Sequence, residues 1–253
     1  MGVTSRSGMS RLLERLGIRY KRARQYVHSP DPDYQSKCDR IELARLRAQY
    51  APTRYVLVYL DELTFYRQPT VAQAWAAQGR DQAKAERSYH TDHHSRIVGA
   101  LNLMTGQLTY LQRSKITAAT LVQLYRKLRQ VYPDAECIYV VLDNWAVHFH
   151  PTVLAALRPQ AWTHPPKLPA SWLPVAATPG DPNGLPIVLL NLPTYASWLN
   201  PIEKLWRWLK QDLLHVHRHS FDWNSLKQQV SQFLDRFESG SIDLLRYVGL
   251  CPD

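Results

Sequence analysis

The chain has 253 residues, of which 45% are hydrophobic and 21% are charged, as in most globular proteins. This length suits one large domain with a small appendage, or two small domains. No apolar stretch approaches the roughly 18 residues that a membrane helix needs, and the first residues lack the apolar core of a signal peptide. Composition therefore argues against secreted, integral-membrane and disordered classes of protein.

The chain is strongly basic, with a net charge of +10 from 31 Lys and Arg against 21 Asp and Glu. Residues 1–50 contain eleven of these cations but only five acidic residues. Such an excess favours a polyanionic partner, nucleic acid before membrane, although it can also serve solubility alone. Cys38, Cys137 and Cys251 lie too far apart for a disulfide framework or a C-x-x-C zinc site, which favours a reducing cytoplasm.

The predicted elements alternate between helices and strands. Residues 10–28 indicate a short helix followed by a basic tail, 29–33 a proline-containing linker, and 34–50 an amphipathic helix. In the body that follows, apolar runs predict strands at 55–60, 137–142 and 187–192, a hairpin at 96–103 and 107–112, and helices at 117–131 and 201–215. This order is typical of an α/β fold with a largely buried sheet.

The segment 159–186 differs in composition from the rest of the chain, because it holds eight of the seventeen prolines. We interpret it as a loop or an inserted flap without regular structure.

Two of the predicted buried strands are followed directly by an aspartate, Asp61 and Asp143. If the strands are parallel neighbours, both side chains lie at the edge of the sheet where α/β proteins bind ligands. Like charges that close repel one another unless a cation lies between them, and hard oxygen ligands suit Mg²⁺ or Mn²⁺. The alternative is that each aspartate is an ordinary turn or helix-cap residue.

A third candidate is Glu203, which lies at the start of the predicted helix at 201–215. Asn200 is expected to be the N-cap and Pro201 the first helical residue. Glu203 could then close a capping box, which is the alternative to a role in a site. Three isolated carboxylates in a basic protein nevertheless favour a common site.

Four segments resemble the motifs of DDE transposases, and most closely those of bacterial insertion-sequence transposases of the mariner superfamily. They are L-D-E-L-T-F at 60–65, A-W-A-A-Q-G-R at 74–80, V-L-D-N-W-A-V-H at 141–148 and P-T-Y-A-S-W-L-N-P-I-E-K-L-W at 193–206. The resemblance covers roughly residues 18–215. It implies a ribonuclease-H-like fold, in which a mixed sheet is flanked by helices.

The resemblance also implies a catalytic triad of Asp61, Asp143 and Glu203 that binds two divalent metal ions, Mg²⁺ or alternatively Mn²⁺. In our hypothesis Asp61 bridges both ions, while Asp143 and Glu203 hold one each. Water would be the nucleophile that cleaves the donor strands, and the freed 3′ end would then attack target DNA at a TA step. Asn144 and His148, which match the family pattern D-N-x-x-x-H, and Asn200 are expected to be accessory residues.

The same comparison predicts contacts with double-stranded DNA. The expected phosphate-binding residues come from the basic tail and from the helix that carries Glu203: Lys21, Arg22, Arg24, Lys204, Arg207 and Lys210. Residues 1–50 are interpreted as a remnant of a DNA-binding region and 51–253 as the catalytic domain. Other expected partners are a second copy of the chain and a separate N-terminal helix-turn-helix polypeptide, in a bacterial cytoplasm at the nucleoid.

Two other functions remain open at this point. The first is an inactive or domesticated DNA-binding protein derived from a transposase, against which the intact triad argues. The second is a ribonuclease-H-like nuclease for repair or for RNA hybrids, against which the W-L-N-P-I-E-K block argues because it resembles transposases.

Overall fold

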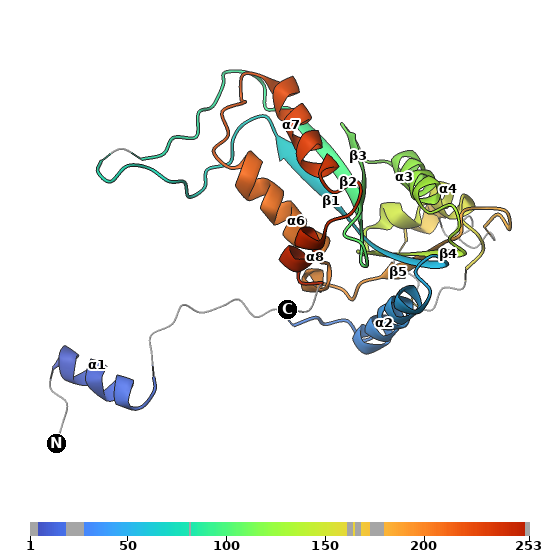
Figure 1. Ribbon diagram of the computed structural model, residues 1–253, viewed down its shortest axis with the longest axis horizontal. Coiled ribbons are helices and arrows are strands. Elements are labelled where there is room, and N and C mark those ends of the chain that lie inside the picture. The colour runs from blue at the N-terminus through green and yellow to red at the C-terminus, as the bar shows by residue number, and fades with distance from the viewer. Residues whose placement is uncertain are drawn as a thin grey trace.

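The computed structural model describes residues 5–18, 28–80, 82–160, 164, 168–172 and 180–250. These residues form a five-stranded sheet with the order β3-β2-β1-β4-β5 (Figure 1). The strands are β1 (Tyr55–Tyr66), β2 (His94–Asn102), β3 (Leu108–Arg113), β4 (Cys137–Leu142) and β5 (Ile187–Asn191). β1, β2 and β3 pair antiparallel, whereas β1, β4 and β5 pair parallel. The predicted mixed sheet is therefore confirmed.

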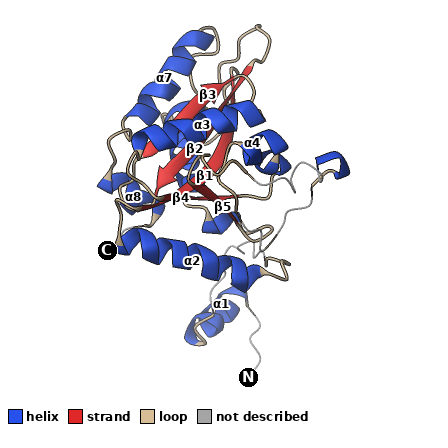
Figure 2. Cartoon of the chain, turned by 90° about the vertical axis from the view of Figure 1, so that its right-hand side faces the viewer, coloured by secondary structure: helices blue, strands red, loops and turns tan. Residues whose placement is uncertain are grey.

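Helices cover both faces of the sheet (Figure 2). On one face, α3 (Ala118–Val131) and α4 (Pro151–Ala155) pack against side chains that alternate along β1, such as Val58 and Leu60. On the other face, α2 (Tyr34–Tyr50) packs against Leu57 and Tyr59. The remaining helices on that face, α6 (Ile202–Leu209), α7 (Trp223–Asp235) and α8 (Ile242–Val248), enclose a core against β1, β2 and β3.

Most of the predicted elements are present with bounds shifted by a few residues, and two differ in a way that matters for the site. β1 does not end at residue 60 but continues to Tyr66, because β2 pairs with it from Val58 to Tyr66. Its parallel pairing with β4 stops at Tyr59. The predicted helix at 201–215 is α6 followed by a π-helical turn, Lys210–Leu214. The short 3₁₀ helices are Ala146–Phe149, Ala170–Trp172 and Ser197–Leu199.

The two helices of the N-terminal region differ in how they pack. The helix α1 (Arg6–Arg15) buries none of its residues and lies apart from the sheet in Figure 1. In contrast, α2 buries Ala44 and Ala48 against the sheet. The basic tail at 19–27 lies outside the described residues.

The described parts of the proline-rich segment include the 3₁₀ turn Ala170–Trp172 and Leu185, which forms a bridge with Leu157 just after α4. Among the described residues, none of the helices combines the length and the apolar character needed to cross a membrane.

Candidate active site

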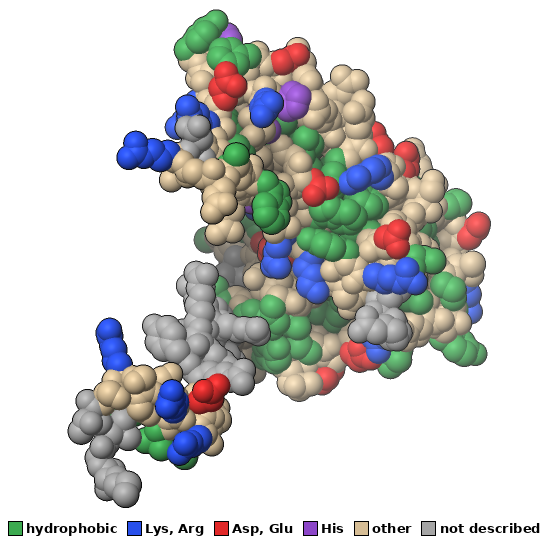
Figure 3. All heavy atoms as spheres, turned by 60° about the vertical axis from the view of Figure 1, so that its left-hand side comes forward, with side chains coloured by type: hydrophobic (Ala, Val, Ile, Leu, Met, Phe, Trp, Pro, Cys, Tyr) green, Lys and Arg blue, Asp and Glu red, His purple; other side chains and the backbone are tan. Residues whose placement is uncertain are grey.

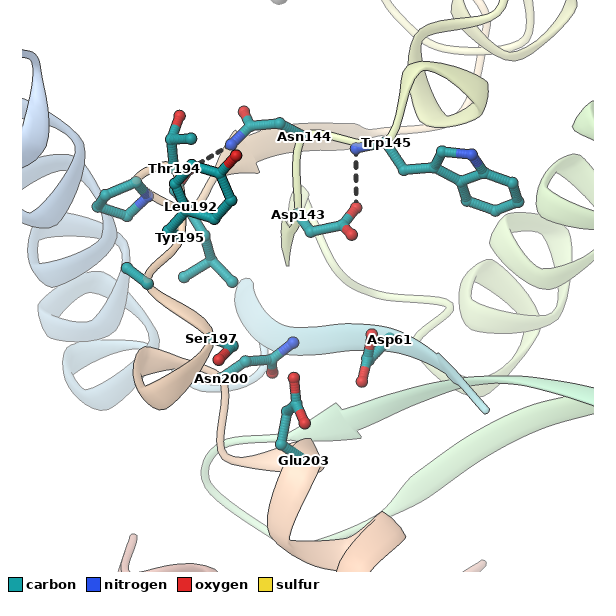
Figure 4. A pocket seen from close by; sticks show the side chains of 12 residues that line it. Asp61, Asp143, Asn144, Trp145, Leu192, Thr194, Tyr195, Ser197, Asn200 and Glu203 are labelled. Atoms are coloured by element: carbon teal, nitrogen blue, oxygen red, sulfur yellow. Dashed lines mark hydrogen bonds between the residues drawn. The ribbon is translucent and has the colours of Figure 1, made fainter. Parts of the chain in front are cut away.

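The three predicted carboxylates line one cavity of about 370 Å³ (Figure 4). Asp61 comes from the middle of β1, Asp143 follows the end of β4, and Glu203 lies in the first turn of α6. The rest of the lining comes from residues 144–145, 192–197 and 200. Segments far apart in the sequence therefore converge on this cavity.

The pairing of β1 with β4 explains why the two aspartates are close. Tyr59 is the register partner of Val141, and Asp61 and Asp143 each follow two residues later along parallel chains. The expectation that these strands are parallel neighbours is confirmed. The expectation that both aspartates terminate strands is correct for Asp143 only, since β1 continues past Asp61 as the partner of β2.

Asp61 is held by Trp206, which lies in α6. The indole Nε1–H of Trp206 donates to Oδ2 of Asp61 at 2.9 Å, and the Trp206 side chain is only 3% exposed. Its ring lies over Gly99, the cross-strand partner of Asp61 on β2. A Cβ atom at residue 99 would lie 2.9 Å from Cη2 of Trp206, so the close approach depends on glycine.

Asp143 is fixed mainly through one of its oxygens. The backbone N–H of Trp145 donates to Oδ1 at 2.9 Å, and Nε2 of His148 lies 3.3 Å from the same atom. Burial acts to raise the pKa of Asp143, but His148 and the Trp145 N–H outweigh it, and the net pKa is below the usual value. Asp143 is therefore suited to be an ionised ligand.

Asn200 does not cap α6 as expected. The helix begins at Ile202 without a side-chain cap, and the Asn200 side chain is buried. Its Nδ2 donates instead to the carbonyl oxygen of Leu60 at 3.2 Å. This bond connects the start of α6 to the residue that precedes Asp61, and it leaves Glu203 exposed beside the cavity rather than in a capping box.

The cavity concentrates negative charge. Burial, followed by the charges of Glu203 and Asp143, raises the pKa of Asp61 to about 7. No Lys, Arg or His is among the described residues that line the cavity. Three carboxylates without a lining cation are the hard-oxygen donor set that divalent metal ions prefer, so the residues fit such ions chemically. In this metal-free arrangement no three His, Cys, Asp or Glu side chains of the described residues converge on a single ion position.

The other predicted residues have varied positions. Asn144 connects two strand ends, because its Nδ2 donates to the carbonyl oxygen of Leu192 and its Oδ1 accepts from Asn191. His148 is fully buried behind Asp143. The Lys204 ammonium donates to the carbonyl oxygen of Val248 and so connects α6 to α8. Arg207 and Lys210 are exposed, and Lys21, Arg22 and Arg24 lie outside the described residues.

Sequence reasoning missed two residues at this site. Trp206 is one of them, although its position one turn after Glu203 places it within reach of the site. Tyr195 lines the cavity, is 73% exposed and has a backbone φ of 57°, which is uncommon for a residue other than glycine. Such backbone strain is often found at functional sites, but no local motif predicts it.

Comparisons with known proteins agree with this architecture. A family model described as DDE superfamily endonuclease matches residues 56–227. The Insertion element IS630 uncharacterized 39 kDa protein of Shigella sonnei is 23% identical over 226 residues. That alignment covers 89% of this chain but 57% of the relative, so the chain spans little more than half the relative's length.

Solved structures of Mos1 transposase share the fold. The paired-end complex with the left transposon end matches with a TM-score of 0.58 and 16% identity over 97% of this chain and 67% of that chain. The mariner paired end complexes with Mn and with Mg match with TM-scores of 0.57 and 0.58, at 15% and 16% identity. Each covers 97% of this chain, and 67% and 68% of the respective structure.

Proposed function

The chain belongs to the DDE superfamily endonuclease family, and we propose that it is the catalytic part of an insertion-sequence transposase that cuts and joins DNA strands. The single observation that supports this most is the convergence of Asp61, Asp143 and Glu203 on one cavity whose described lining contains no Lys, Arg or His. In this proposal the substrate is double-stranded DNA at the ends of a mobile element and at a target, with a TA step as the preferred target.

The three carboxylates are the proposed metal ligands, with Mg²⁺ or Mn²⁺ as the ion. When bound, two such ions would activate the attacking oxygen and neutralise charge on the leaving oxygen of the phosphodiester. The protein's contribution is to hold the ligands. Trp206 fixes one oxygen of Asp61, Trp145 fixes one oxygen of Asp143, and Asn200 connects the helix of Glu203 to β1.

The proposed path of the DNA follows the exposed side of α6. Arg207 and Lys210 lie four and seven residues after Glu203, so a helical spacing places them on its side of the element. Figure 3 shows Lys and Arg side chains beside a recess on one face of the molecule. A phosphate backbone that reaches Glu203 would be stabilised by these cations.

The proposal extends to partners that bring two DNA ends together. We propose that a second copy of this chain joins the assembly and that a separate helix-turn-helix polypeptide supplies further DNA contacts; the solved Mos1 structure that shares the fold is a paired-end complex with a transposon end. We place the reaction in the bacterial cytoplasm, at the nucleoid.

Cleavage of a labelled duplex that carries the ends of the encoding element tests the proposal. We expect nicking with Mg²⁺ or Mn²⁺ but not with EDTA, and we expect its loss in Asp143→Asn. Glu136→Gln changes an exposed carboxyl that pairs with Arg54 away from the cavity, so this control keeps the activity. Retained nicking in Asp143→Asn overturns the assignment of the triad. DNA binding without metal-dependent nicking instead supports the inactive DNA-binding alternative.

A further inference from the structure

A buried carboxyl lies next to the candidate active site, on the face of the sheet opposite to Asp61. Glu62 follows Asp61 on β1, so its side chain points to the opposite face of the sheet, the face that Leu60 shares. Its cross-strand partner is Val98, and both Leu60 and Val98 are at most 1% exposed. The Glu62 side chain is 17% exposed, and its Oε1 is buried without a hydrogen bond among the described residues.

His148 lies between this carboxyl and Asp143. Its Nε2 is 3.6 Å from Oε1 of Glu62 and 3.3 Å from Oδ1 of Asp143, and its side chain is 0% exposed. The imidazole ring contacts Trp145 and Phe149 edge-on, with centroid distances of 5.5 Å and 6.4 Å. These two aromatic rings limit how the imidazole can turn, so Nε2 faces both carboxyls.

The cost of burial argues that Glu62 has a role beyond packing. A carboxyl in an apolar layer loses hydration, and an aliphatic side chain such as those of its neighbours would fill the same space more favourably. The polar neighbours of Glu62 are the buried hydroxyl of Tyr125, with which its charge interacts, and the Nε2 of His148, which lies 3.6 Å from Oε1. That nitrogen in turn faces the Asp143 oxygen that the Trp145 N–H already holds. The other Asp143 oxygen, Oδ2, is thereby left for a ligand in the cavity.

We infer that Glu62 is a positioning residue that acts through His148 to fix the orientation of the Asp143 carboxylate. In this inference Glu62 orients the imidazole, the imidazole lies against the Oδ1 atom that the Trp145 N–H holds, and Oδ2 would remain available to bind a metal ion. This inference rests on the proposed function, because it takes Asp143 as a metal ligand. It assigns a role to a residue that is neither in the expected triad nor among the expected accessory residues.

Calorimetric titration with Mn²⁺, alongside DNA nicking, tests the inference. Glu62→Met replaces the carboxyl with an apolar chain of similar length. We expect it to weaken Mn²⁺ binding and to slow nicking about tenfold, as is usual when a group behind a metal ligand is removed. The melting temperature should stay the same or rise, because a buried carboxyl is removed. Glu62→Gln, which keeps a polar end against His148, should restore most of the Mn²⁺ affinity.

A double-mutant cycle separates an effect through His148 from a direct one. In a His148→Leu background, Glu62→Met should cause no further loss of Mn²⁺ affinity. A further tenfold loss there would show that Glu62 acts on the site by another route and would overturn the inference. Glu136→Gln is the control, because it changes an exposed carboxyl that pairs with Arg54 away from the cavity and should leave Mn²⁺ binding unchanged.

The outcomes distinguish this inference from the proposed function. If the wild-type chain binds Mn²⁺ in a manner that Asp143→Asn abolishes, but Glu62→Met binds it equally well, only the positioning role is wrong. If the wild type shows no Asp143-dependent Mn²⁺ binding, the proposed function and the inference fail together. Should Glu62→Met not fold, Glu62→Leu provides a second apolar replacement, and wild-type affinity in that variant would also overturn the inference.

Discussion

Trp206 donates its indole N–H to the Asp61 carboxylate at 2.9 Å, across the junction between α6 and β1. Trp206→Phe keeps an aromatic ring in the core but removes this donor. We expect DNA nicking to fall about tenfold while the chain remains folded, because Asp61 loses the group that fixes one of its oxygens. Nicking rates at saturating Mn²⁺, together with a thermal melt, measure both effects.

The same helix provides the control for this prediction. Nε1 of Trp208 donates to Oδ2 of Asp212 at 2.9 Å, but Trp208 is half-buried, Asp212 is exposed, and neither lines the cavity. Trp208→Phe therefore makes the same chemical change without touching Asp61, and nicking should be unchanged. Equal rates for the two variants would show that the Trp206 bond does not matter for the reaction.

Gly99 leaves the space through which Trp206 reaches Asp61, so we expect a larger residue at position 99 to disturb this contact. A Cβ at residue 99 would lie 2.9 Å from the far edge of the indole, and Gly99→Ala should lower the free energy of unfolding by about 1–3 kcal/mol through overpacking. The cost should be smaller in a Trp206→Phe background, where that edge of the ring is gone. Urea unfolding of the two single variants and the double variant measures the difference. Strict additivity would contradict a direct clash.

The sequence predicts which strands carry this site better than it predicts the length of each strand. Continuous apolar runs identify β4 and β5, and the aspartate that follows β4 is found correctly. The length of β1 is harder to predict, because Asp61 and Glu62 interrupt the apolar run while backbone pairing with β2 continues to Tyr66. Hydropathy reports burial of side chains, whereas a strand persists as long as its backbone has a partner.

Asn200 shows why local motifs fail where tertiary contacts compete. Asn followed by Pro is a strong signal for the start of a helix. The amide nevertheless bonds to the carbonyl oxygen of Leu60, which is 140 residues away in the sequence. Burial beside β1 makes that acceptor available and removes the side chain from the helix end. No pattern within a few residues of Asn200 carries that information.

Asp31 connects the segment before α2 to the wall of the cavity. Its Oδ2 accepts from Nζ of Lys37 and from the backbone N–H of Thr194, each at 2.7 Å, and both charged side chains are at most 10% exposed. Asp31→Asn leaves Lys37 buried without its counter-charge, so the free energy of unfolding should fall by about 3 kcal/mol. Glu136→Gln, which breaks an exposed pair with Arg54, should cost less than about 1 kcal/mol.

The same contacts give Asp31 a defined pH dependence. Burial acts to raise its pKa, but Lys37 and the backbone N–H groups of Thr194 and Asp33 outweigh it, and the net pKa is well below the usual value. The unfolded chain therefore takes up the proton first as the pH falls. The contribution of ionised Asp31 to the stability of the fold is complete above about pH 4 and is lost as the pH falls further. Acid unfolding that begins at the same pH in wild type and Asp31→Asn would contradict this prediction.

Protonation of His217 should destabilise the fold at a higher pH than protonation of Asp31 does. Its side chain is buried, its Nδ1 accepts the backbone N–H of His219, and its Nε2 has no hydrogen bond among the described residues. Burial, with a smaller effect of the His219 charge, lowers the pKa of His217 to about 4. The unfolded chain binds this proton near pH 6.5, so the contribution of a neutral His217 to stability is complete above that pH and is lost as the pH falls toward 4.

Urea unfolding between pH 7.5 and pH 4.5 measures the effect of His217. We expect the wild type to lose about 2 kcal/mol more than His217→Asn over this range, because asparagine does not titrate and its side-chain oxygen can still accept the His219 N–H. Comparing the two slopes cancels the other groups that titrate in this range. If the slopes are equal, His217 is protonated as readily in the folded chain as in the unfolded one, and its burial does not control its charge.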